Sequence, residues 1–169
     1  MDSIGINKGH YHEETWTYDL HTNTMDVTNI FVRIQIKRNQ IMKVLIIDFQ
    51  YIDEKCFVLF QSKLGSGKAL WYGDSPVVNN EYHVEIEIHD NLLWGNNILS
   101  SLSRKYNIES VNDDLILTGK IESIDNDGYT VIRLDESIVC IEAIGKPFPL
   151  GAFVDVYTKD VELFNLNYL

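Results

Sequence analysis

The sequence has few cysteines, few basic residues and no long apolar run. Only two of its 169 residues are cysteine, Cys56 and Cys140, and each lies inside a short apolar stretch. We interpret them as small core side chains in a reducing compartment, because two such residues do not make a disulfide framework. The longest aliphatic run, residues 44–47, is far too short to span a bilayer. No basic segment followed by an apolar one opens the sequence, so we expect a cytoplasmic protein with no membrane contact.

Basic residues are outnumbered throughout, with 14 Lys and Arg against 25 Asp and Glu and a net charge of −11. The imbalance is steeper in residues 111–169, which hold 11 acidic and 4 basic residues. A negative field repels phosphate backbones and attracts cationic partners. The charge therefore predicts no nucleic-acid ligand and favours a basic protein partner. An acidic surface also keeps a protein soluble, and this simpler interpretation stays open.

Catalytic signatures are also lacking. The stretch Leu-Gly-Ser-Gly-Lys-Ala at residues 64–69 is similar to a phosphate loop. However, Ser62 stands where that loop needs its first glycine, and Ala69 replaces the hydroxyl residue that binds magnesium. The turn at residues 125–128 lacks the first and last carboxylates of a calcium loop. No Gly-x-Ser-x-Gly motif or Cys-His pair can be argued, so we predict a protein that is not an enzyme and needs no cofactor.

What the sequence does contain is period-two alternation, which is typical of half-buried strands. It is clearest in residues 81–89, where apolar and polar side chains alternate without a break. Residues 96–108 give the only helical spacing, and the glycines at 65, 67 and 73 predict a loop. We therefore expect a mostly β protein with at most one or two short helices, and an antiparallel meander or sandwich in its N-terminal part. Further strands are expected at residues 30–37, 41–51 and 56–60.

Residues 114–168 read as five short strands joined by Gly or Asp-Gly turns. The polar stretch 110–113 predicts a boundary between a domain of residues 1–110 and an acidic one of residues 111–169. Two small sheets often share one core, so a single sandwich is the alternative. Oligomeric state does not follow from the pattern.

Three segments of this stretch, TGKIESID, TVIRLDESIVCIEA and LGAFVDVYTKDVELF, together resemble small OB-type barrels of the transport-associated kind. The resemblance covers residues 114–166 and implies a five-stranded barrel with a binding role. Such barrels bind sugars, oxyanions, nucleic acids or proteins, so the fold does not select a ligand. Residues 1–110 resemble no family.

Two candidate surfaces emerge. In the strand at 81–89, His83, Glu85, Glu87 and His89 share one face and could ligate a divalent metal, although any solvated strand face has the same pattern. A cluster of His10, His12, Glu13 and Glu14, with His21 nearby, is a weaker form of the same pattern.

The second surface consists of aromatic side chains beside carboxylates. Phe153, Asp155 and Tyr157 share the face opposite the inward side chains of their strand, and we add Asp135 and Glu136, which form a predicted turn. This pattern suits a basic protein partner, or else the face packs on residues 1–110. We therefore predict a non-catalytic interaction protein, for example a bacterial immunity protein or antitoxin that blocks a basic toxin. The alternatives are a small-ligand or metal-binding β protein and an accessory subunit of a larger assembly.

Overall fold

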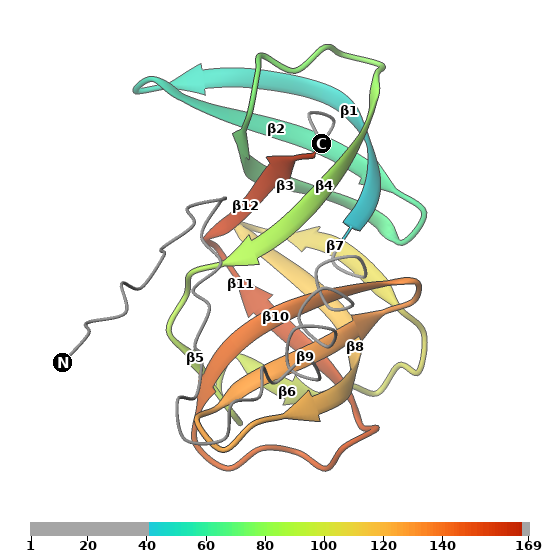
Figure 1. Cartoon of the computed structure of the whole chain (residues 1–169), viewed down its shortest axis with the longest axis vertical. Coiled ribbons are helices and arrows are strands. Elements are labelled where there is room, and N and C mark those ends of the chain that lie inside the picture. The colour runs from blue at the N-terminus through green and yellow to red at the C-terminus, as the bar shows by residue number, and fades with distance from the viewer. Residues whose placement is uncertain (1–40, 167–169) are drawn as a thin grey trace, which may run out of the picture. The chain divides into compact units, whose positions relative to one another are not determined.

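The computed structural model describes residues 41–166, all of which belong to one compact unit, Gln35–Leu169. This part of the chain has twelve strands and no helix (Figure 1), so the predicted mostly β class is confirmed. The expected strand at residues 30–37 and the histidine cluster at residues 10–21 lie outside the described residues. The strands are β1 (Ile41–Ile52), β2 (Lys55–Ser62), β3 (Gly65–Tyr72), β4 (Glu81–Ile88), β5 (Leu92–Leu93), β6 (Ile98–Ser100), β7 (Asn107–Val111), β8 (Asp114–Ile124), β9 (Tyr129–Leu134), β10 (Ser137–Ile144), β11 (Phe153–Thr158) and β12 (Val161–Asn165).

Five strands close into a barrel in the order β1-β2-β3-β12-β4, drawn together in the upper part of Figure 1. β1, β2 and β3 form an antiparallel meander, and β12 pairs parallel with β3 and antiparallel with β4. Alternate side chains of every strand point inward, and those of Val44, Val58 and Phe60 are at most 1% exposed. Each large apolar side chain buried in this way contributes about 1.5–3 kcal/mol to stability.

The closed five-stranded barrel is confirmed, but its strands come from another part of the chain than the resemblance covers. Of residues 114–166, only β12 belongs to the barrel. A meander whose third strand runs parallel to the last is the connectivity of an OB-type barrel. Here, residues 89–160 are inserted between its fourth and fifth strands.

The inserted residues build a second set of strands, drawn below the barrel in Figure 1. β8 is central: it pairs with β7 over its first half, with β9 over its second half, and with β11. β9 continues to β10, and β10 to β5, while β6 pairs with β11. β7 runs through the predicted boundary at Ser110. In addition, β12, which follows this boundary in the sequence, pairs with β3 and β4, which precede it. The division into domains at this residue stays a prediction.

Two local predictions are wrong. The expected helix at residues 96–108 is instead β6, a connection and β7. In the connection, the backbone N–H of Ser103 donates to the hydroxyl of Ser101, and that of Lys105 to the hydroxyl of Ser103. Such serine bonds compete with helical ones.

The expected loop at residues 65–76 is wrong for residues 65–72, which form β3, whereas residues 73–76 lie outside the strands as predicted. Gly67 is buried there, and a Cβ at this position would run into Leu115 and Phe60. A glycine inside a strand can mark such a close approach rather than a loop.

The β1–β2 hairpin turns on two residues with positive φ, Asp53 at 47° and Glu54 at 65°. Two-residue turns of this kind favour Asn-Gly, because a side chain in the left-handed region is strained. We expect Glu54→Gly to raise the free energy of unfolding by about 0.5–1 kcal/mol. Urea denaturation measures the change, with Glu54→Ala as the control that removes the carboxylate and leaves the strain. Equal stabilisation by both variants would assign the effect to charge and contradict the conformational reason.

Candidate acidic groove and metal-ligating cluster

A groove of about 640 Å³ lies between β4 and β10. Its polar wall consists of five carboxylates and one imidazole, and no Lys or Arg of the described residues lines it. Tyr129 and Cys140 supply part of the opposite wall. The acidic side chains are Glu85, Glu87, Asp90, Asp127 and Glu142.

The strand pattern places these groups. The inward face of β4 carries Val84 and Ile86 into the barrel core, so Glu85 and Glu87 point outward. Glu142 lies on β10 directly opposite Tyr129 of β9. The groove is therefore a consequence of period-two alternation on two strands that are far apart in the sequence.

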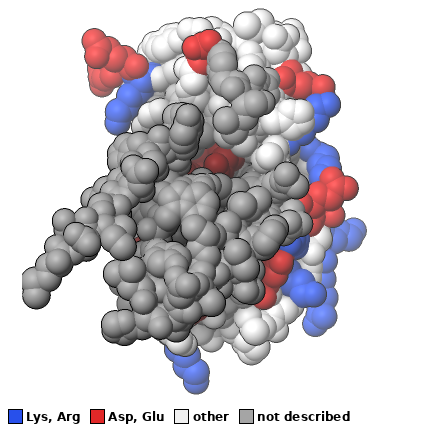
Figure 2. Space-filling model, in the orientation of Figure 1, with Lys and Arg blue, Asp and Glu red and all other residues white. Residues whose placement is uncertain are grey.

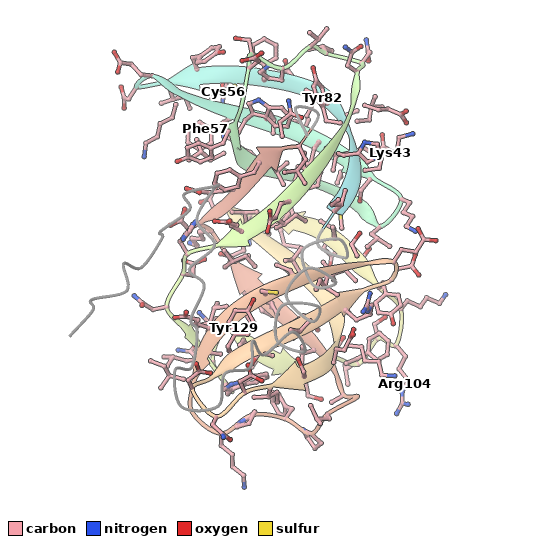
Figure 3. All side chains as sticks on the ribbon, viewed as in Figure 1. Lys43, Cys56, Phe57, Tyr82, Arg104 and Tyr129 are labelled. Carbon is pink, nitrogen blue, oxygen red and sulfur yellow. The ribbon has the colours of Figure 1, made fainter. Side chains whose placement is uncertain are left out.

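Tyr129 lies among the inserted strands (Figure 3), where burial, followed by its hydrogen bond with Cys140 and the nearby negative charges, raises the pKa of its phenol. The hydroxyl therefore stays protonated at neutral pH and can donate a hydrogen bond. Cys56 is buried, as predicted, whereas Cys140 is only half-buried, and neither of them forms a disulfide. Burial also raises the pKa of the Cys56 thiol, which keeps it in the unreactive protonated form.

Asp90 holds the β11–β12 turn. Its Oδ2 accepts hydrogen bonds from the Thr158 hydroxyl and from the backbone N–H groups of Lys159 at 2.8 Å and Asp160 at 3.2 Å. Burial by itself would raise the pKa of Asp90, but these three bonds outweigh it and lower the pKa below its usual value. Asp90 therefore contributes a fixed negative charge at the end of the groove.

The four residues of the predicted metal-binding face are divided between two grooves. Glu85, Glu87 and His89 line the acidic groove, whereas His83 lines another one together with Lys43 and Lys63. Instead, Glu162 of β12 joins Glu87 and His89 to form a cluster whose ligand atoms all lie within 4.8 Å of one another. Sequence reasoning missed Glu162 because the contact joins residues 73 positions apart. The sequence indicates only that Glu162, which lies between the apolar residues Val161 and Leu163, points outward.

The predicted partner-binding residues also lie on separate surfaces. Phe153, Asp155 and Tyr157 lie on β11, and their side chains are half-buried. The Phe153 ring packs at 5.3 Å from that of Tyr106, and Asp155 accepts a 2.8 Å hydrogen bond from Thr118. These contacts cover part of the face.

Asp135 and Glu136 form the β9–β10 turn and bind Lys63, at 2.8 and 2.7 Å from its Nζ. Hydrogen bonds to these two carboxylates raise the pKa of Lys63. The turn is thus held by a cation of the chain itself.

Several cations are already paired with carboxylates. Figure 2 shows Lys and Arg side chains next to Asp and Glu along one edge of the molecule. Lys43 lies 2.7 Å from Glu81, and Arg133 binds Glu122 through two nitrogens. In each of these two pairs the opposite charges offset each other.

Comparison with protein-family models, with curated proteins and with solved structures found no match for this chain. Residues 41–166 contain no helix long and apolar enough to cross a membrane. The chain is thus placed by its fold alone, as a β protein with a closed five-stranded barrel.

Proposed function

We propose that this chain is a non-catalytic interaction protein whose acidic groove binds a basic segment of a protein partner. The observation that supports it is the groove between β4 and β10, which is lined by five carboxylates and, among the described residues, by no Lys or Arg. The Tyr129 ring lies beside them, and tyrosine rings are enriched in protein interfaces.

Charge and shape act together in this proposal. A net charge of −11 speeds the approach of a cationic partner, and a concave acidic wall then orders its Lys or Arg side chains. Phosphate backbones are repelled by the same field, so a nucleic-acid ligand is disfavoured. The partner is therefore a protein rather than RNA or DNA.

One concrete form of the proposal is a bacterial cytoplasmic immunity protein or antitoxin. Toxins that act on nucleic acids carry basic grooves, and an acidic protein that occupies such a groove blocks it. Small size, strong acidity and the lack of a catalytic signature support this form. The β11 face with the half-buried side chains of Phe153 and Tyr157 would supply a second, aromatic contact.

The groove can be tested with a fluorescent peptide of alternating Lys and Gly as the probe, followed by the product of the adjacent gene. We expect Asp127→Asn together with Glu142→Gln to weaken binding about tenfold, because two exposed charge contacts at about 0.7 kcal/mol each are lost. Fluorescence anisotropy at low and at physiological salt measures the change, and the wild-type affinity should fall as salt rises.

The matched control removes two charges at the β1–β2 hairpin, Asp53→Asn with Glu54→Gln, outside the groove lining. This variant should bind within about twofold of the wild type, since screening limits distant charges. Equal weakening by both variants would show that net charge alone attracts the probe, and the groove proposal would be wrong.

A further inference from the structure

We propose that Glu87, His89 and Glu162 form a binding site for a divalent transition metal, of which Zn²⁺ fits the ligands best. Two carboxylate oxygens and one imidazole nitrogen are ligands that zinc accepts in proteins. The site goes beyond the proposed function, because metal binding here does not require any partner in the groove.

Strand pairing fixes the first two ligands. Glu87 of β4 and Glu162 of β12 are direct partners across an antiparallel pair, so their side chains leave the barrel on the same face. His89 follows β4 immediately, and its backbone N–H donates to the carbonyl of Asp160 at 3.2 Å. All three side chains thus extend from paired backbone rather than from a free loop.

The distances match those of a metal site. Ligand atoms of tetrahedral zinc lie about 2.1 Å from the ion and therefore about 3.4 Å from one another. His89 Nε2 lies 3.5 Å from Glu87 Oε2 and 3.1 Å from Glu162 Oε2. The third spacing, between the two carboxylates, is within 4.8 Å, so an ion needs only small side-chain shifts.

Electrostatics also favours a cation at this place. Two carboxylates directly opposite on neighbouring strands repel each other. Within residues 41–166, no Lys or Arg forms an ion pair with either of them, and the basic group that lies within 3.5 Å of both is His89. The Glu162 side chain is only 15% exposed, so water screens this repulsion poorly. A divalent ion would remove the repulsion.

A second layer orients Glu162. The Tyr72 hydroxyl donates to Glu162 Oε1 at 3.2 Å, which leaves Oε2 directed at His89. The Tyr72 ring is itself stacked on Phe164, with centroids 4.7 Å apart and planes 6° from parallel. Metal-ligating carboxylates are commonly held by such outer hydrogen bonds. Three protein ligands leave a fourth position for water or for a side chain of a bound partner.

The test is calorimetric titration of tag-free full-length protein with ZnCl₂ alone. We expect one equivalent to bind, and His89→Ala and Glu162→Gln each to weaken binding at least tenfold. His83→Ala is the matched control, since His83 is an outward imidazole of the same strand that lines another groove. It should leave the affinity unchanged within about twofold.

The other histidines must also be separated from the site. A variant with His10, His12 and His21 all replaced by alanine should keep the equivalent of zinc, and thermal melts without metal show whether each variant is folded. The site is overturned if folded His89→Ala binds zinc like the wild type, or if His83→Ala or the triple variant loses the ion. Asp127→Asn with Glu142→Gln should keep zinc while binding the basic peptide about tenfold more weakly, so failure of one proposal is distinguishable from failure of the other.

Discussion

Gly65→Ala lowers the free energy of unfolding by about 3 kcal/mol or more, the largest effect that we expect from one methyl group in this chain. Gly65 has a φ of 132°, which a residue with a side chain adopts only under strain. A Cβ there would also overlap the carbonyl oxygen of Ile108, because β3 and β7 meet at this pair. The backbone N–H of Ile108 donates to Leu64 at 2.9 Å, so β7 cannot retreat without losing that bond.

Urea denaturation of the wild type and of Gly65→Ala measures the loss. Gly95→Ala is the matched control, since Gly95 also has a positive φ, 81°, but a Cβ there meets no atom within 4 Å. The control should lose only the conformational part, about 1 kcal/mol. Equal losses in the two variants would show that the close approach of β3 and β7 contributes nothing.

Asp90→Ala is expected to cost about 2–3 kcal/mol, the second largest effect. The substitution removes the acceptor of three hydrogen bonds and leaves the hydroxyl of Thr158, a residue only 2% exposed, without its partner. Bonds to a charged acceptor are stronger than neutral ones, so Asp90→Asn should lose less, about 1 kcal/mol. Chemical denaturation measures both variants.

The control for Asp90 is Asp48→Ala, because Asp48 is exposed and, within residues 41–166, accepts only the N–H of the adjacent Phe49. It should change stability by less than about 0.5 kcal/mol. If Asp90→Ala also changes stability by less than about 0.5 kcal/mol, the β11–β12 turn is held by its own backbone. The three hydrogen bonds to Asp90 would then contribute no measurable stability.

Local patterns predicted the strands well where one face is buried and the other is not. The alternation at residues 81–89 and the Asp-Gly turn at residues 125–128 appear in the structure as β4 and the β8–β9 turn. Local patterns failed where a tertiary contact decided the outcome. Gly67 indicated a loop because its tight fit against Phe60 and Leu115 has no signature nearby in the sequence.

The metal-ligating cluster could be predicted only in part, because local patterns do not show which strands pair with each other. Alternation shows that Glu87 and His89 point outward together, but not that His83 of the same strand lines a different groove together with Lys43. Glu162 could be added only once β12 was known to pair with β4. The acidic groove likewise needs β10 beside β4, and no local period predicts that neighbourhood.

The insertion of residues 89–160 into the barrel affects the order in which the strands can pair while the chain is being synthesised. β1, β2, β3 and β4 emerge from the ribosome first, yet the ring closes only when residues 161–165 follow. Until then, β3 and β4 keep edges of unpaired N–H and C=O groups, which invite wrong pairing with other chains. Three of the six pairings among the inserted strands join strands that follow each other in the sequence, so these strands can begin to fold during that interval. The closing strand also carries Glu162, so the metal-ligating cluster is completed in the same step as the barrel.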